Sequence, residues 1–166
     1  MGAPDPKTLY DEDFYLWTQD QAERLRAMAG DKRLDIEHLA DEVADLGRSE
    51  LNKVTEHLTQ LVAHLLVLAW LDNPPPSGQW RAEIVNHHIQ ARRTFTPGMR
   101  QHLDSEEIWA DAHRLADAKL EDYDDPRLPW NLPVVINADE LLNPALDVEA
   151  ARTRVAAAIR NDIALD

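Results

Sequence analysis

The sequence predicts an all-α fold: an up-and-down helical bundle of four main helices, with an extra C-terminal helix and an irregular proline-rich arm. Apolar residues recur at three- and four-residue steps along several segments, which is the pattern of helices buried on one face. Glycine supplies only 5 of the 166 residues, and β-branched residues do not alternate with polar ones as they would in a half-exposed sheet. Short reversals separate the helical segments, so we expect one domain over residues 1–166.

The first predicted helix begins near Asp11 or Asp13 and stops near Gly30, because glycine commonly ends helices. One face of this helix is mostly apolar, and we expect it to point toward the core. That face consists of Phe14, Trp17, Gln21, Leu25 and Met28.

The second predicted helix begins after Asp35, a good N-cap residue, and ends before the triple proline at 74–76. Its apolar positions are Ile36, Leu39, Val43, Leu46, Leu51, Val54, Leu58, Leu61, Leu65 and Leu68. The five-residue step after Leu46, which contains Gly47, breaks the phase of this stripe. The segment is therefore either two helices that meet at Gly47 or one long helix that is kinked or closely packed there. We favour one long, bent helix.

Three further helices and an arm follow. The third helix runs from Ser77 to near Pro97, and the fourth begins after an N-cap at Asp104. Residues 126–146 hold four prolines and no helical period, so we expect an arm that docks on the bundle and contains at most one short strand. The last helix begins after a cap at Asp147.

The composition excludes several classes of function. The chain has 17 Lys and Arg against 31 Asp and Glu, a formal net charge of −14, so it repels nucleic acids and anionic membranes in general. It has no cysteine, which removes disulfides and thiolate chemistry. The most apolar stretch, residues 61–71, is too short to cross a bilayer, and the first residues lack the apolar run of a signal peptide. We therefore expect a cytoplasmic protein that binds no membrane.

Four histidines form a candidate transition-metal site. His57 and His64 are seven residues apart on one helix face, and His87 or His88 on the third helix can meet them across the bundle. Three converging imidazoles suit Zn²⁺, Ni²⁺ or Fe²⁺ and would activate a bound water. The alternative is a hydrogen-bonded core histidine at His64 with surface histidines elsewhere. We favour this alternative, because no metal-binding spacing such as HxxxH occurs, and we expect no metal and no cofactor.

Charge is segregated along the chain. Residues 77–103 contain four arginines against one glutamate, a net charge of +3, while residues 104–126 contain nine acidic residues against two basic ones, a net charge of −7. Helices of opposite sign attract each other within a fold or across a symmetric dimer. The second helix carries a further acidic group that forms a solvated face or pairs with arginines of a partner. It consists of Glu37, Asp41, Glu42 and Asp45.

Five stretches of the chain form distinctive motifs: residues 10–26 (YDEDFYLWTQDQAERLR), 35–43 (DIEHLADEV), 45–50 (DLGRSE), 61–66 (LVAHLL) and Trp80-Arg81. Together they resemble a bacterial family, domain of unknown function 29, over residues 10–144, with residues 145–166 as a C-terminal helical extension. The resemblance implies a small helical bundle without an established activity. It also marks polar residues that fall inside the family motifs, namely His38, Glu42, Arg48, Ser49, Glu50 and His64.

These features lead to three hypotheses of function. The leading one is a non-enzymatic protein-interaction or regulatory module, acting as a homodimer or on another protein, because the long amphipathic helices can extend an interface and no nucleotide or nucleophile motif occurs. The second is a metal-dependent enzyme similar in architecture to damage-inducible helical bundles that hold a metal with three histidines. It requires His64 and either His87 or His88 to lie near a common point. The third is a weak RNA or DNA binder that uses Arg81, Arg92 and Arg93.

Overall fold

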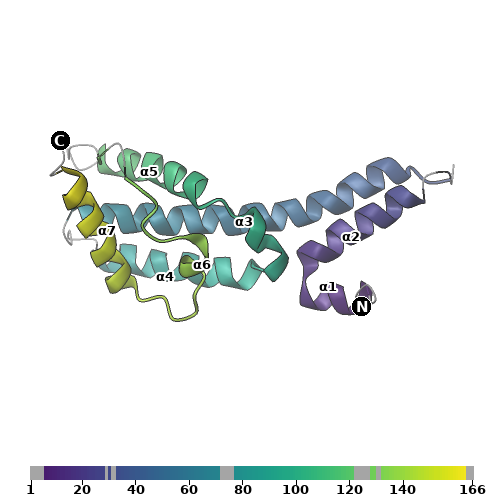
Figure 1. Cartoon of the computed structure of the whole chain (residues 1–166), viewed down its shortest axis with the longest axis horizontal. Helices are drawn as coiled ribbons and strands as arrows, with labels where there is room; N and C mark the ends of the chain where they lie inside the picture. Colours follow the sequence, from purple (N-terminus) through teal and green to yellow (C-terminus); the bar gives the residue numbers. More distant parts are fainter. Residues whose placement is uncertain are drawn as a thin grey trace. The chain divides into compact units, whose positions relative to one another are not determined.

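The protein is helical, which confirms the predicted all-α class (Figure 1). A computed structural model describes residues 6–28, 30, 33–71, 77–121, 128–129 and 132–163, and no strand forms among them. The elements are α1 (Pro6–Glu12), α2 (Phe14–Ala27), α3 (Ile36–Trp70), α4 (Ser77–Thr94), the 3-10 helix η1 (Pro97–His102), α5 (Ser105–Glu121), α6 (Ala138–Leu141) and α7 (Val148–Ile163).

The elements form two compact units. Unit 1 contains Met1–Lys53 and Thr94–Leu103, and unit 2 contains Val54–Arg93 and Asp104–Asp166. The long helix α3 supplies residues to both units and runs without interruption through Gly47. Of the two predicted alternatives, this continuity confirms one long helix and excludes two separate helices that meet at Gly47. The expectation of one domain stays a prediction.

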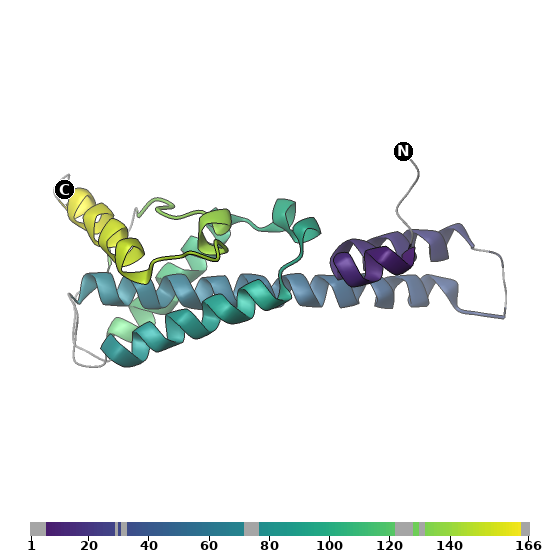
Figure 2. The same ribbon diagram turned by 90° about the horizontal axis from the view of Figure 1, so that it is seen from below.

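In unit 1, α2 and the first part of α3 lie side by side and run in opposite directions, as a helical hairpin (Figures 1 and 2). They are in close contact at Gly47, where an added Cβ atom would lie 2.1 Å from the Thr18 hydroxyl oxygen. Nearby, the Gln19 side-chain amide donates a hydrogen bond to the Ala44 carbonyl at 3.4 Å. Three alanines form a buried cluster between the helices: Ala22, Ala40 and Ala44. Small residues therefore set the distance between α2 and α3.

The close approach in the hairpin overturns part of the sequence prediction. The buried residues of α2 are Tyr15, Thr18 and Ala22, instead of the predicted stripe. On α3, Ile36 is buried as expected, but Leu39 and Leu46 are 43% and 54% exposed. Met28 of the predicted α2 stripe is 61% exposed. Where two backbones meet at a glycine, large side chains do not fit between them and lie beside the contact instead.

The side chain of Asp13 joins the start of α2 to η1. It is buried, and its carboxylate accepts hydrogen bonds from the Leu16 amide at 3.1 Å, the Thr96 hydroxyl at 2.7 Å and the Gly98 amide at 2.6 Å. An added Cβ atom at Gly98 would lie 2.4 Å from Leu16 Cγ, so a side chain there would collide with α2. The sequence prediction missed η1 because these contacts, which come from a distant segment, fix it.

A separate helix, α1, precedes Asp13. We expected the first helix to begin near Asp11 or Asp13. Asp13 is the N-cap of α2, but the chain is already helical from Pro6 to Glu12, so Asp11 lies within α1. The ring of Tyr10 in α1 contacts the rings of Phe14 and Trp17 edge-on, with centroids 5.6 and 4.8 Å apart. Helix α1 therefore covers the first part of the predicted α2 stripe.

Unit 2 is built on the second part of α3, with α4 and α5 beside it (Figures 1 and 2). Here the predicted stripe of α3 is buried: Val54, Leu58, Leu61, Leu65 and Leu68. Every residue from Leu61 to Ala69 is buried, so this stretch of α3 is covered on all sides. The other helices contribute Trp80, Ile84, Ile108, Trp109, Ala112, Leu120, Ala151, Val155 and Ile159 to the core.

The arm predicted for residues 126–146 docks on α5 through its described part. The Trp109 side chain donates a hydrogen bond from Nε1 to the Ile136 carbonyl at 2.8 Å. The prediction that the arm holds no helix is wrong, because the four-residue helix α6 forms after a capping box at Asn137. No strand forms in its described residues, and residues 126, 127, 130 and 131 lie outside the described part of the chain.

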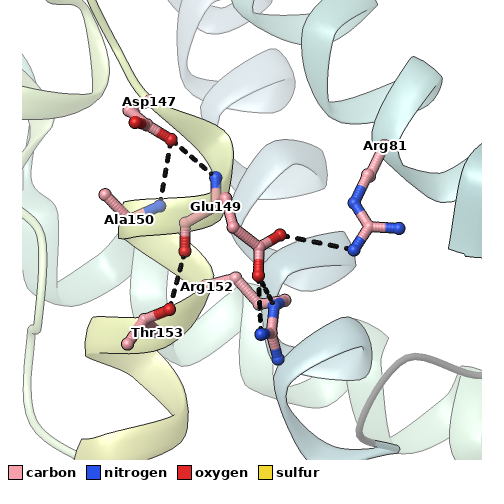
Figure 3. Close-up of polar contacts among 6 residues, drawn as sticks. All are labelled: Arg81, Asp147, Glu149, Ala150, Arg152 and Thr153. Atoms are coloured by element: carbon pink, nitrogen blue, oxygen red, sulfur yellow. Dashed lines mark hydrogen bonds and ion pairs between the residues drawn. The ribbon is translucent and has the colours of Figure 1, made fainter.

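Helix α7 begins at a cap and is fastened to α4 (Figure 3). Asp147 accepts hydrogen bonds from the amides of Glu149 and Ala150 at 2.9 and 3.0 Å, which confirms the predicted cap. The Glu149 carboxylate is held by Arg152 Nε at 2.7 Å and by Arg81 of α4 at 3.3 Å. The hydrogen bonds from Arg152, and then from Arg81, hold the pKa of Glu149 below its usual value.

The other two predicted caps are also confirmed. Asp35 accepts a hydrogen bond from the His38 amide at 3.4 Å at the start of α3. Asp104 accepts hydrogen bonds from the amides of Glu106 and Glu107 at 2.9 and 3.2 Å at the start of α5. Each carboxylate satisfies amide groups that a helix N-terminus leaves without an intrahelical partner.

We expect Gly47→Ala to destabilise unit 1. The added methyl collides with Thr18, whose hydroxyl is already bonded to the Tyr15 carbonyl at 2.7 Å and cannot move freely. Overpacking of this kind costs about 1–3 kcal/mol, which exceeds the gain in helix propensity of roughly 1 kcal/mol. Urea denaturation should show a net loss of about 1 kcal/mol. The matched control is Gly78→Ala, where nothing lies within 4 Å; equal stability of the two variants would contradict the packing argument.

Candidate functional site

The polar residues of the family motifs do not form one site. Five of them lie on α3 in unit 1, namely His38, Glu42, Arg48, Ser49 and Glu50, and the sixth, His64, belongs to unit 2. From His38 to Glu50 the helix rises by about 18 Å, and successive residues turn by about 100°. His38, Glu42 and Ser49 share one face of the helix, whereas Arg48 and Glu50 are turned about 100° to either side of Ser49, so the five side chains are spread along the helix and around it.

Several of these α3 residues are engaged by neighbours on the same helix. His38 Nδ1 lies 2.7 Å from Asp35, and this hydrogen bond raises the pKa of the imidazole. Arg48 forms an ion pair with Asp45, and Glu50 forms one with Lys53 at 2.5 Å. Contacts three residues apart are what an isolated solvated helix also makes. The arrangement supports the solvated-face interpretation of this acidic stretch.

Three histidines come together in unit 2, as the seven-residue spacing predicts. His57 Nδ1 and His87 Nδ1 are 3.1 Å apart, and the centroids of their rings are 5.3 Å apart. The rings of His64 and His87 are stacked, with centroids 5.9 Å apart and planes 22° from parallel. His64 is buried, and its Nδ1 has no hydrogen-bond partner among the described residues.

The histidine cluster (His57, His64 and His87) does not converge on one point. Stacked rings direct their nitrogen lone pairs within parallel planes instead of toward each other. His88 turns away and places Nε2 2.9 Å from the Asn143 carbonyl. Within the described ranges, no group of three His, Asp or Glu side chains is arranged to hold a metal ion. The proximity on which the metal-enzyme hypothesis depends is thus present for His57, His64 and His87, and absent for His88.

Burial disfavours the protonated form of two histidines of the cluster, His64 and His87. Burial, together with the charges of Lys119 and His87, lowers the pKa of His64 to about 4. Burial, followed by the neighbouring His57, also lowers the pKa of His87. The hydrogen bond between His57 and His87 requires one Nδ1 to carry a proton and the other to accept it. The lowered pKa values therefore favour the neutral forms of His64 and His87.

A cavity of about 520 Å³ lies in unit 2 between α5 and the arm. Its lining combines the apolar residues Leu66, Trp109, Ala110, Leu132, Pro133 and Val134 with Glu106, His113 and Arg114. His113 Nε2 lies 2.9 Å from the Pro129 carbonyl, and Arg114 pairs with Asp111 at 3.1 Å. The sequence analysis missed His113, although its spacing of four residues from Asp117 was a signal. The contact from His113 to Pro129 holds the arm on α5 and occupies Nε2 of that histidine.

An apolar surface of unit 1 is a second candidate site. Among the described residues, six of the eight exposed large apolar side chains lie in this unit: Tyr10, Leu16, Met28, Leu34, Leu39 and Leu46. We call five residues of α2 and α3 the hairpin face: Leu25, Met28, Leu39, Val43 and Leu46. Leu25 and Val43 are partly buried against the alanine cluster, and the other three are exposed. The sequence analysis found these residues but assigned them to the core.

Both helices contribute to the same side of the hairpin. Leu25 follows Ala22 by three residues, and Val43 follows Ala40 by three residues, which is the same rotation about each helix. Because α2 and α3 run in opposite directions, this rotation takes both side chains to one side of the pair. The other side of the pair carries the ion pair of Arg26 and Asp41 at 2.8 Å. The hairpin thus has one apolar and one charged side.

The fold and these surfaces define a small all-α protein with an exposed helical hairpin. Residues 9–145 match the family described as Domain of unknown function DUF29, so the chain belongs to this family. The helix α7, from Val148, lies beyond the matched residues, and the expectation of a C-terminal extension stays a prediction.

One solved structure has the same fold. It is an alpha-helical protein of unknown function from Rhodospirillum rubrum, with a TM-score of 0.81 and 32% sequence identity over 87% of this chain and 96% of that one. No curated protein matches the chain. None of the described helices combines the length and the apolar character needed to span a membrane.

We expect His64 to make unit 2 less stable in acid. Its pKa of about 4 in the folded state lies below the ordinary value of 6.5, so the unfolded chain takes up the proton more readily. Stability is then complete above pH 6.5 and falls as the pH drops toward 4. The loss between pH 7.5 and pH 5 is about 2 kcal/mol.

The variant His64→Leu removes this titration and should flatten the pH dependence of unfolding by about that amount. Urea denaturation of both proteins at pH 7.5 and pH 5 measures the difference, and circular dichroism at pH 7.5 checks that the variant folds. An unchanged slope in the variant would show that other groups cause the acid sensitivity.

Proposed function

We propose that this protein is a protein-interaction module and that its contact surface is the hairpin face. The observation that carries the proposal is the exposure of Met28, Leu39 and Leu46 on one side of unit 1. Single exposed apolar residues are ordinary, but a continuous apolar side of a helical pair is typical of an interface.

The small core of unit 1 supports the proposal. The contact between its two long helices consists mainly of alanine, threonine and glycine, which bury little apolar area. Small units with such cores commonly gain stability from association. A partner that covers the hairpin face would supply the apolar burial that the alanine cluster lacks.

The placement of the charged residues favours this function over the other two hypotheses. Arg81, which the nucleic-acid hypothesis needs, is bonded to Glu149 in unit 2, and the chain carries a net charge of −14. The motif residues Arg48 and Glu50 form ion pairs with their neighbours along α3. The cytoplasmic location expected from the sequence stays a prediction.

A photo-crosslinking residue at Leu39 tests the proposal in cells. We expect a discrete crosslinked product, because a partner that binds the hairpin face covers this position. The matched control places the photo-crosslinking residue at position 37 in place of Glu37. Glu37 is exposed and lies two residues before Leu39, about 200° away around α3. The product should be absent or much weaker there.

The mass of the product identifies the partner as a second copy or another protein. Equal labelling from Leu39 and Glu37, or no product from either, would contradict an interface at the hairpin face. For both variants, with the crosslinking residue at Leu39 or at Glu37, the protein level in the cell has to match that of the unmodified chain, since a misfolded variant would be degraded.

A further inference from the structure

We infer that the partner of the hairpin face is a second copy of this chain, and that two hairpins stack face to face as a four-helix bundle. This inference rests on the proposed function. In this dimer, α2 of one copy lies over α3 of the other, and the two-fold axis runs parallel to the helices.

The shape of the hairpin face favours another hairpin as its occupant. The face extends over two adjacent helices and is one layer of a helical bundle. Its α3 residues Leu39, Val43 and Leu46 follow at steps of four and three residues, which is the spacing of a helix that packs along another helix at a small angle. A layer of two such helices is matched by a second layer of two helices, as in four-helix bundles.

Charges at the rims of the face select the second copy and its orientation. Arg24 follows Ala22 by two residues, and Glu42 follows Ala40 by two residues, so each lies about 200° from the alanine contact on its own helix. Arg24 is four residues before Met28, so it borders the apolar stripe of α2. Glu42 lies between Leu39 and Leu46 in the same way. The two charges therefore lie on opposite rims of one hairpin and do not meet within it.

The two rims are at the same level along the hairpin. Contacts between Gln19 and Ala44, and between Arg26 and Asp41, fix the alignment of α2 with α3. This alignment places Arg24 level with the part of α3 around residues 40–42. Glu42 has no ion-pair partner among the described residues, whereas Arg24 pairs with Asp20 at 2.6 Å on an exposed surface.

Stacking α2 of one copy over α3 of the other brings these rims together. Arg24 of each copy then faces Glu42 of the other, which gives two ion pairs related by the two-fold axis. The alternative orientation, with α3 over α3, places like parts of that helix together. Its first ten residues, 36–45, contain four acidic residues and no Lys or Arg, so they attract a basic rim and repel a copy of themselves in register.

Charge reversal tests this arrangement in the purified full chain. Arg24→Glu alone places two acidic pairs across the interface, and Glu42→Arg alone places two basic pairs there. Each single variant should therefore bind itself at least about tenfold more weakly than the wild type, because like charges facing each other are strongly unfavourable. Sedimentation over a concentration series measures the dimer dissociation constant.

Mixing the two single variants supplies the decisive measurement. In a mixed dimer, the acidic side chain introduced by R24E faces the basic side chain introduced by E42R, and the native Arg24 and Glu42 face each other at the second ion pair. The mixture should therefore recover dimers close to the wild-type level, detected by mass after labelling one variant with a heavy isotope. A contact within one hairpin cannot produce this rescue between chains. The matched control is Val85→Lys with Ile89→Lys, which adds charge at exposed apolar positions of unit 2 and should leave the dimer unchanged.

Three outcomes would overturn the inference: a monomeric wild type, single variants that dimerise normally, or a mixture that dimerises no better than its components. If the wild type is monomeric but Leu39 crosslinks to a protein of another mass, the interaction function stands and the second copy is wrong. If neither assay gives a complex, both the function and the partner are wrong. Circular dichroism of each variant separates loss of association from loss of folding.

Discussion

The absence of a side chain at Gly47 is the constraint on which unit 1 depends. It lets α3 approach α2 so closely that a single added carbon would lie 2.1 Å from the Thr18 hydroxyl. The alanines of the cluster continue this contact along the hairpin, and small side chains of this kind let two helices approach closely. A contact of this kind positions two backbones well, but it removes little apolar surface from water. The large residues of α2 and α3 are left beside it.

The same helix packs in a different way within unit 2. From Val54 onward α3 carries leucines and valines that are fully buried, so its neighbours are held by large interlocking side chains. The histidine cluster is embedded in this region, where the burial of His64 makes protonation costly. Helix α3 therefore combines two forms of packing, one through small residues that leaves apolar groups exposed and one through large residues that buries a polar group.

The buried residues of α3 were easier to predict from the sequence in unit 2 than in unit 1. Local hydrogen bonds determine helix starts, so the caps at Asp35, Asp104 and Asp147 were predictable, and so was the leucine stripe of unit 2. In unit 1 the periodicity showed which residues share a helix face, but it could not show which face is buried. We expected the large side chains Leu39 and Leu46 to be in the core, but the alanines are buried instead. The helix η1 was missed because a distant segment holds it, whereas α6 was missed although its local capping box, Asn137 with Glu140, was a signal. For the site, spacing predicted that His57 and His64 share a helix face, but it could not show that His64 stacks on His87 or that His88 points elsewhere.

Association also explains how a weakly packed hairpin can serve as a functional element. If the hairpin face is covered by a second hairpin, the free energy of association adds to the stability of unit 1 and grows with protein concentration, as mass action requires. The core of unit 2, which buries its large side chains internally, has no such dependence. Small residues at the α2–α3 contact would then be part of the function: they hold the two helices close enough to present one continuous apolar layer. Larger residues there would strengthen the hairpin alone only by spreading its helices apart and disrupting that layer.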